Sequence, residues 1–325
     1  MGWSGRVEWM LAAISHPVEA ARVVGVDRGL CRLATASGRR TLPFHDVAVG
    51  DWLALTKVSK DGPLDRGAGV AGPVRHEVLP RWSRLERIGH GGVVQVMAAN
   101  VDVVCVVAPG DRLSLPRVER EIAIAWDSGA RPVVVLTKLD RTAPETVSEL
   151  TGRLGGVACV LSSSVTGDGL DELRRLLVAP LTAVLLGPSG AGKSTLVNAL
   201  LGEDRLAVGA VRDDGRGRHT TSARRLVPLP SGGCLIDMPG VRSLVAATTA
   251  GAVAQAFPDV ERIAEGCRFG DCAHESEPDC AVLAAVDAGE LDPARLASFR
   301  RLSPEIVPAE RRGRPRGHPG GTTPG

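Results

Sequence analysis

Nine consecutive residues carry the clearest chemistry in this sequence: Gly187-Pro188-Ser189-Gly190-Ala191-Gly192-Lys193-Ser194-Thr195. They match the G-x-x-x-x-G-K-[ST] pattern of a phosphate-binding loop in every fixed position. The glycines let consecutive backbone N–H groups turn toward one anion, and Lys193 adds a mobile positive charge near the β- and γ-phosphates. Ser194 is the expected Mg²⁺ ligand. An apolar run precedes the loop and a helical pattern follows it, as this type of loop requires.

A second group of residues, upstream of the loop, predicts the base of the nucleotide. Thr137-Lys138-Leu139-Asp140 is close to the N-K-x-D element that GTPases use to bind guanine. An ionised Asp140 only accepts hydrogen bonds. Guanine offers two adjacent donors and adenine offers neither, so bound ATP would leave the carboxylate unpaired. Thr137 stands where asparagine is usual, and we expect it to reduce nucleotide affinity.

A serine-rich loop follows the next expected strand. GTPases place a loop that contacts guanine O6 through backbone N–H groups at the corresponding point, and Ser162-Ser163-Ser164 occupies it here. The residues expected to bind GTP are therefore Thr137, Lys138, Leu139, Asp140, Ser162, Ser163, Ser164 and the nine residues of the phosphate loop, Gly187 to Thr195.

Two segments after the phosphate loop are candidates for sensing the γ-phosphate. Gly217-Arg218-His219-Thr220-Thr221 lies in a polar stretch, where Thr220 or Thr221 is expected to bind Mg²⁺. Asp237-Met238-Pro239-Gly240 ends an expected strand. Asp237 is predicted to hold Mg²⁺ through water, and the Gly240 N–H to meet the γ-phosphate.

The group that orients the attacking water is harder to assign. Many GTPases carry a glutamine soon after D-x-P-G, but Val241 follows here and cannot orient water. His219 is the predicted substitute, with an ordinary solvated histidine as the alternative. Together with Lys193 and Gly240 it completes the predicted catalytic set. We therefore expect slow intrinsic hydrolysis and stimulation by a partner.

A cysteine-rich cluster near the C-terminus predicts a metal site. Cys267, Cys272, His274 and Cys280 supply three thiolates and one imidazole, a full tetrahedral shell for structural Zn²⁺ with no open position for catalysis. The alternative is a coincidental cluster of buried or reactive side chains. The other four cysteines lie in strand-like sequence and are interpreted as small buried residues, at positions 31, 105, 159 and 234.

The elements that must position the nucleotide site form an alternating pattern. Strands are expected at 102–107, 132–136, 157–161 and 181–186, and helices at 115–128, 145–154 and 170–177. This alternation predicts a doubly wound α/β sheet. The base-reading elements precede the phosphate loop, which reverses the order of ordinary GTPases. The domain is therefore predicted to be circularly permuted.

The two ends of the chain predict further modules. Short β-type segments at 21–27, 30–35 and 51–56 suggest a small barrel of OB type, with a purely structural β module as the alternative. Helices are expected at 281–288 and 293–302. We expect an OB-type barrel at 1–95, a permuted P-loop GTPase domain at 96–250, a mainly helical zinc domain at 251–305 and a disordered basic tail at 306–325.

Composition limits the class of protein. The 325 residues are 44% hydrophobic and 23% charged, which is ordinary for a chain with several soluble domains. No apolar run reaches the roughly 18 residues that span a membrane, and the first ten residues lack a signal peptide's apolar core. We expect a cytoplasmic protein without membrane contact. The net charge is +2, and basic residues are in excess at both ends, which is compatible with nucleic-acid contact.

These features together resemble one family. The permuted order, Ala98-Ala99-Asn100-Val101-Asp102, the G-R-H-T-T and D-M-P-G motifs and the metal pattern are similar to the small-ribosomal-subunit-dependent GTPase A family (RsgA, also called YjeQ), over about residues 20–305. The resemblance implies GTP hydrolysis to GDP in late maturation of the small (30S) ribosomal subunit, contact with its rRNA, and stimulation by the subunit. Mg²⁺ and one Zn²⁺ are the implied cofactors, and we expect a monomer. The alternative is a GTP-dependent regulatory switch acting on a non-ribosomal partner.

Overall fold

The computed structural model describes residues 2–27, 29–44, 46–57, 74–88, 93–202, 224–238 and 249–303. The chain divides into two compact units, Met1–Ala246 and Ala247–Gly325. Four residues of the predicted site lie outside the described residues: His219, Thr220, Thr221 and Gly240. The tail predicted to be disordered also lies outside them.

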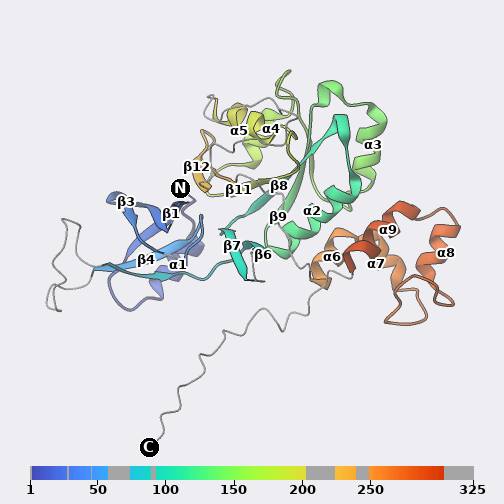
Figure 1. Cartoon of the computed structure of the whole chain (residues 1–325), viewed down its shortest axis with the longest axis horizontal. Coiled ribbons are helices and arrows are strands. Elements are labelled where there is room, and N and C mark those ends of the chain that lie inside the picture. Colours follow the sequence, from blue (N-terminus) through green and yellow to red (C-terminus); the bar gives the residue numbers. More distant parts are fainter. Residues whose placement is uncertain are drawn as a thin grey trace, which may run out of the picture. The chain divides into compact units, whose positions relative to one another are not determined.

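A parallel sheet forms the centre of the first unit (Figure 1). Its strands are β8 (Val103–Pro109), β9 (Arg131–Thr137), β10 (Cys159–Leu161), β11 (Thr182–Leu186) and β13 (Cys234–Asp237). They are hydrogen-bonded in the order β10-β9-β8-β11-β13. Every residue of β8 and β11 is buried, so these strands read as continuous apolar runs. The predicted alternation of strands and helices is present.

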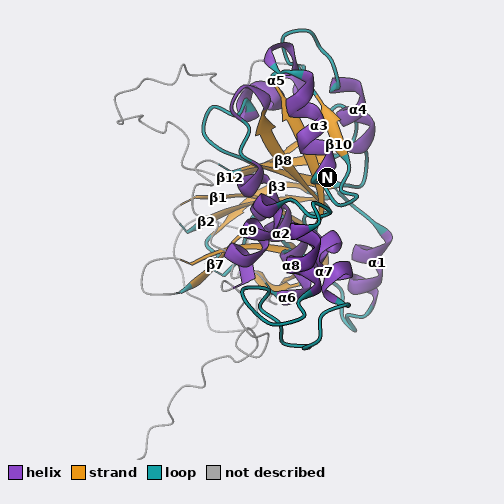
Figure 2. Ribbon diagram, turned by 90° about the vertical axis from the view of Figure 1, so that its right-hand side faces the viewer, coloured by secondary structure: helices purple, strands orange, loops and turns teal. Residues whose placement is uncertain are grey.

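Helices cover both faces of this sheet (Figure 2). On one face, Val103, Cys105 and Val107 of β8 share a core with α4 (Leu170–Leu176) and α5 (Lys193–Leu201). Successive strand residues point to opposite faces. The intervening residues of β8 therefore face the other side, where α2 (Leu115–Asp127) packs against β8 and β9. The remaining elements of this part are η2 (Gly110–Arg112), η3 (Leu139–Arg141) and α3 (Pro144–Gly152).

The N-terminal part of the same unit is antiparallel. Its strands are β1 (Glu19–Asp27), β2 (Leu30–Thr35), β3 (Gly38–Leu42), β4 (Trp52–Lys57) and β5 (Val74–Val78), paired in the order β5-β4-β1-β2-β3. Val23, Leu33 and Leu53 form the centre of their shared core. A short helix, α1 (Gly5–Ala12), packs Val7 and Met10 against Trp52. The predicted β-segments are present, whereas α1 was not predicted.

One strand joins the two parts. β12 (Arg224–Pro228) pairs antiparallel with β13 on one side and with β1 on the other. The described strands therefore form one eleven-stranded sheet, beside a separate hairpin of β6 (Arg84–Ile88) and β7 (Val94–Ala99). The buried Arg22 of β1 also donates a hydrogen bond to Thr182 Oγ1 at the start of β11, at 2.9 Å. The sequence did not predict this continuity.

The described part of the second unit is helical, coloured orange to red in Figure 1. It contains α6 (Ala250–Ala256), α7 (Pro258–Ala264), α8 (Ala281–Asp287) and α9 (Pro293–Leu302). Arg295 is 2% exposed and its Nη2 lies 2.7 Å from Asp259 Oδ1, which ties α9 to α7. Helices α8 and α9 agree with the sequence prediction. Across the described residues of both units, no helix combines the length and the hydrophobicity needed to span a bilayer.

Candidate nucleotide and metal sites

The phosphate loop connects β11 to α5, as its motif predicts. Gly187 has a φ of +143°, and a side chain added there would collide with the carbonyl oxygen of Val107 on β8. Only glycine therefore lets the loop leave the sheet at this point. Lys193 folds back over the loop, and its Nζ donates to the carbonyl oxygens of Gly187 and Pro188, both at 2.7 Å.

The predicted nucleotide residues meet at one edge of the sheet. Parallel strands end at the same edge, so the C-terminal ends of β9, β10, β11 and β13 lie together there. The backbone N–H of Leu139 donates to the Ser162 carbonyl at 3.1 Å, which joins the two segments predicted to read the base. Thr137 Oγ1 donates to the Ala191 carbonyl at 2.7 Å, which joins the first of them to the phosphate loop.

Thr137 has a defined structural role here. Its side chain is 5% exposed, and its hydroxyl provides the link to the Ala191 carbonyl. A Cβ built on Gly192 would lie 3.8 Å from the Thr137 hydroxyl oxygen, so the loop and the strand end are in close contact. Threonine in place of the usual asparagine therefore does not leave this position without a hydrogen bond.

Asp140 is held ready to accept hydrogen bonds. Ser163 Oγ donates to Asp140 Oδ1 at 2.6 Å, and this hydrogen bond lowers the pKa of the carboxyl group below its ordinary value. Ser163 Oγ also accepts from the backbone N–H groups of Val165 and Thr166, at 3.2 and 3.3 Å. The carboxylate is therefore ionised and oriented by the serine-rich loop, as a guanine-reading group requires.

Asp111 and Arg112 also belong to this edge. Asp111 Oδ2 lies 2.8 Å from the Nζ of Lys138, a residue with a left-handed backbone and a φ of +59°. The neighbouring Arg112 donates from Nη2 to the Ser189 carbonyl at 2.8 Å. No sequence motif points to Asp111 or Arg112. Their position directly after β8, the neighbour of β11, is the signal that locates them at the ligand edge.

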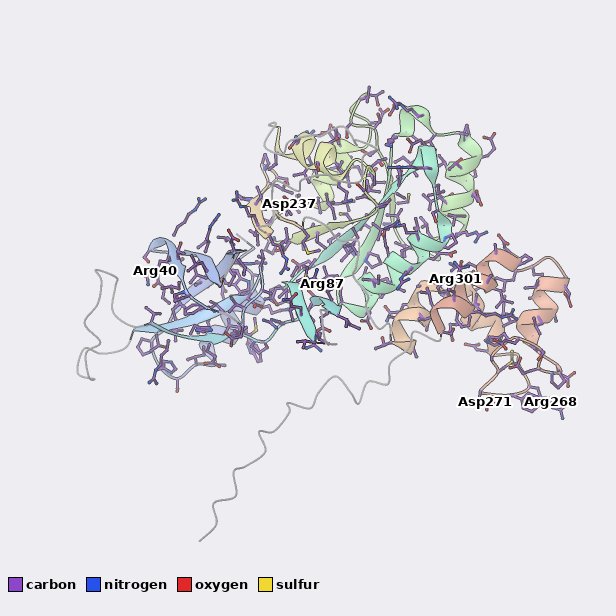
Figure 3. The ribbon with its side chains drawn as sticks, in the orientation of Figure 1. Arg40, Arg87, Asp237, Arg268, Asp271 and Arg301 are labelled. Atoms are coloured by element: carbon purple, nitrogen blue, oxygen red, sulfur yellow. The ribbon has the colours of Figure 1, made fainter. Side chains whose placement is uncertain are left out.

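Asp237 ends β13 and is labelled in Figure 3. Burial raises the pKa of its carboxyl group, while the positive charges of Arg225 and Lys193 act in the opposite direction. Lys193 begins α5, directly after the loop that follows β11, the strand that pairs with β13. A half-buried carboxylate near the phosphate-loop lysine, with the exposed Ser194 at the start of α5, is a donor set suited to Mg²⁺.

Comparison with known proteins gives a family for this arrangement. A sequence profile of the RsgA GTPase family matches residues 78–247. The "Small ribosomal subunit biogenesis GTPase RsgA" of Streptomyces coelicolor is 44% identical over 323 residues, which cover 94% of this chain and 85% of that protein. The chain belongs to the RsgA family. It is accordingly a GTPase, an enzyme that hydrolyses GTP, of the family named for biogenesis of the small ribosomal subunit.

Other RsgA relatives agree with this result. The protein of the same name from Streptomyces avermitilis is 45% identical over 320 residues, which cover 93% of this chain and 83% of that protein. The crystal structure of YjeQ from Thermotoga maritima has a TM-score of 0.62 at 22% identity, covering 89% of this chain and 99% of that one. YloQ, described as a circularly permuted GTPase, has a TM-score of 0.61 at 20% identity, covering 93% and 99%. The two structures share the fold.

The cysteine cluster lies in the second unit of this RsgA-family chain. The ligand atoms of Cys267, Cys272, His274 and Cys280 all lie within 4.8 Å of one another. Cys267 Sγ is 3.8 Å from Cys280 Sγ and 3.6 Å from His274 Nδ1. Zn–S bonds of about 2.3 Å in a tetrahedron place two sulfur atoms about 3.8 Å apart. The spacing therefore fits a Zn²⁺ ion bound through Nδ1 of the histidine.

Backbone N–H groups from the start of α8 contact two of the sulfur atoms in this cluster. Burial acts to raise the pKa of Cys267, but the backbone N–H groups of Val282 and Ala281 donate to its sulfur, and the pKa is lowered overall. Cys280 Sγ accepts from the Leu283 N–H at 3.5 Å. Thiolates are the form that binds metal, so the start of α8 favours the ligand state of Cys267.

A carboxylate organises the loop between the ligands. Glu277 accepts hydrogen bonds from the backbone N–H groups of Ala273, Glu275 and Ser276, at 2.8 to 3.0 Å. Together with its own N–H, these lower its pKa to about 2. The same loop carries Arg268 and Asp271, labelled in Figure 3. The sequence predicted that these four cysteine and histidine side chains cluster, but not the glutamate that shapes the turn around them.

Proposed function

We propose that this RsgA-family GTPase acts in maturation of the small (30S) ribosomal subunit, and that the subunit stimulates its GTP hydrolysis. The observation that most strongly supports GTP as the nucleotide is the position of one side-chain pair. The Asp140–Ser163 pair lies at the same sheet edge as the phosphate loop, linked to it through Thr137. The partner is proposed from the printed names of the relatives, which are small ribosomal subunit biogenesis GTPases.

Different residues of this sheet edge are proposed to contact the base, the phosphates and Mg²⁺. The Asp140 carboxylate would accept from N1–H and the 2-amino group of guanine. The N–H groups of Ser162 and Ser163 donate to backbone carbonyls, so the Ser164 N–H would be the donor that faces O6. The phosphate-loop N–H groups and Lys193 bind the phosphates. Ser194 and Asp237, with Thr220 or Thr221, are the proposed Mg²⁺ ligands; Mg²⁺ would neutralise charge on the β- and γ-phosphates. His219 and Gly240 remain the proposed groups at the attacking water and the γ-phosphate.

The antiparallel N-terminal strands are proposed to form an OB-type module that contacts rRNA. Arg39 and Arg40 lie on β3, at one edge of the eleven-stranded sheet, and Arg40 is labelled with Arg87 in Figure 3. Arginine side chains pair with phosphate oxygens and stack on bases, which suits a surface with few aromatic residues. We place the protein in the cytoplasm, where its proposed partner is assembled, and propose a monomer.

Zinc is proposed as a structural ion. The three thiolates and one imidazole fill a tetrahedral shell, so a bound Zn²⁺ would hold the loop closed and leave no position for substrate. This assignment makes the second unit a zinc domain. Its role would be to present a surface to the ribosomal partner rather than to take part in hydrolysis.

The test is GTP turnover measured with and without small subunits. We expect turnover to rise by about 10³-fold, which corresponds to about 4 kcal/mol of added transition-state stabilisation. Large subunits at equal concentration are the matched control. Co-sedimentation with small subunits should be stronger with a non-hydrolysable GTP analogue than with GDP. Unchanged turnover together with nucleotide-independent sedimentation would refute the ribosomal assignment.

A further inference from the structure

We propose that Arg112 is a positioning residue for nucleotide binding, because it fixes the orientation of one peptide group in the phosphate loop. Arg112 ends η2, and its Nη2 donates to the Ser189 carbonyl at 2.8 Å across 77 residues of sequence. The contact is charge-assisted, so it is stronger than a neutral hydrogen bond. The inference rests on the GTP site proposed above and adds a residue to it.

The hydrogen bond from Arg112 fixes the orientation of the peptide group between Ser189 and Gly190, because a peptide group is planar. The peptide bond after Ser189 is trans, since the one cis bond in the described part of the chain is Ala179–Pro180. In a trans peptide the C=O and the N–H point in opposite directions. While Arg112 holds the Ser189 carbonyl, the N–H of Gly190 must point away from η2. Gly190 has a φ of +71°, which glycine adopts without strain.

The N–H of Gly190 is available to a ligand. Gly190 is exposed, and none of the described residues accepts a hydrogen bond from its N–H. Loops of this type bind phosphates through backbone N–H groups. The orientation that Arg112 imposes therefore presents a free donor in the segment that must surround the phosphates.

Arg112 supplements Lys193 in this task. Lys193 donates to the carbonyls of Gly187 and Pro188, so the two cations together hold three consecutive carbonyl oxygens of the loop. A phosphate-loop lysine reaches to the β- and γ-phosphates when nucleotide binds. Lys193 then divides its three N–H donors between the carbonyls and the phosphates, whereas Arg112 stays on the Ser189 carbonyl. The loop retains one fixed peptide in the bound state.

The turn that carries Arg112 is itself anchored. Asp111 Oδ2 lies 2.8 Å from Lys138 Nζ, and a side chain added to Gly110 would collide with Thr142. The turn therefore packs closely against the segment that reads the base. Because η2 contacts both the base-reading segment and the phosphate loop, Arg112 acts from a fixed platform and not from a free loop.

The test is a graded series at position 112 in the full-length protein. Arg112→Met removes the donor and the charge, Arg112→Gln keeps a neutral donor, and Arg112→Lys keeps a charged one. With Mg²⁺ and mant-labelled GTP or GDP as probes, we expect affinity to fall about tenfold for Met, less for Gln, and at most about threefold for Lys. KM for GTP should rise in parallel while kcat changes less, because the peptide is held in both ground and transition states.

Arg175→Ala is the control, since it removes the same charge from an exposed position on α4. It should bind both probes like the wild type. Three results would overturn the proposal: wild-type affinity in Arg112→Met, an equal loss in Arg175→Ala, or equal losses in all three position-112 variants. Wild-type protein that fails to bind mant-GTP would instead refute the proposed GTP site, so the two failures are distinguishable.

Discussion

The nucleotide edge and the zinc cluster are built in opposite ways. The residues of the nucleotide edge lie at or just after the ends of five different strands and span residues 111 to 237 of the sequence, and the sheet brings them together. The four proposed zinc ligands come from a single segment, Cys267 to Cys280, that contains no strand and ends where α8 begins. The first site is assembled by the core of its domain, and the second by a local loop.

This difference predicts different sources of rigidity. Every residue of β8 and β11 beneath the nucleotide edge is buried, so packing alone fixes the strand ends. The zinc segment is mostly polar, and Cys267 and Cys272 are only partly buried. Such a segment buries little apolar surface, so we expect the proposed metal bonds to supply much of its stabilisation. The nucleotide edge should therefore keep its shape without ligand, whereas the zinc loop should not.

Removing the proposed zinc should give the largest effect on stability. It directly tests whether the zinc loop, unlike the nucleotide edge, depends on its ligand for its shape. The purified protein should contain one zinc per chain by mass spectrometry of the metal. Chelation should cost the second unit on the order of 10 kcal/mol of stabilisation, because structural zinc binding is largely folding free energy. We expect amide hydrogen exchange across residues 249–303 to rise strongly. Exchange in β8 and β11, and binding of mant-GDP, should stay unchanged.

Two cysteine variants sharpen this experiment. Cys272→Ser removes a ligand and should lose the zinc, whereas Cys159→Ser replaces a half-buried thiol on β10 and should retain it. A zinc-free protein whose residues 249–303 exchange as slowly as before would contradict the idea that the metal orders this unit.

Asp140→Asn should give the next largest effect, a loss of GTP affinity. This loss should be confined to the nucleotide edge. The amide no longer accepts from both guanine donors, so GTP affinity should fall by about 10² or more. Xanthosine triphosphate should bind better than to the wild type, because its 2-carbonyl accepts from the new amide N–H. Binding competition between the two nucleotides measures the change.

Asp171→Asn, on the exposed surface of α4, is the charge-matched control. It should leave nucleotide preference as it is, and neither variant should alter zinc content. Retained preference for GTP in Asp140→Asn would show that this carboxylate does not read the base.

Sequence patterns predict what depends on local periodicity or on ligand chemistry. The strands and helices around the nucleotide edge follow from apolar runs and helical spacing, and the zinc ligands from residue type and spacing alone. The pairing of β12 with β1 is a backbone contact between segments about 200 residues apart, and no side-chain pattern encodes it. Asp111 and Arg112 were missed because their contacts join segments that only the fold brings together. Glu277 was missed because no residue pattern marks a carboxylate that accepts from its own loop.

At Thr137, too, the sequence pattern does not show the hydrogen bond that the fold makes possible. Substitution of this residue has the smallest effect that we predict. The sequence comparison with N-K-x-D predicts that threonine reduces nucleotide affinity. In the structure its hydroxyl donates to the Ala191 carbonyl at 2.7 Å, so the link to the phosphate loop is already made. Thr137→Val removes that donor with little change of shape and should cost about 1 kcal/mol, or about fivefold in mant-GDP affinity.

Thr137→Asn decides between the two interpretations. If the hydroxyl replaces the amide fully, restoring asparagine at this 5% exposed position should change affinity by less than about threefold. A tenfold gain in the Asn variant would show that threonine weakens the site, as the motif alone predicts. Zinc content and exchange in residues 249–303 should be the same in both variants, because a change at the sheet edge has no reason to reach a loop held by its own metal.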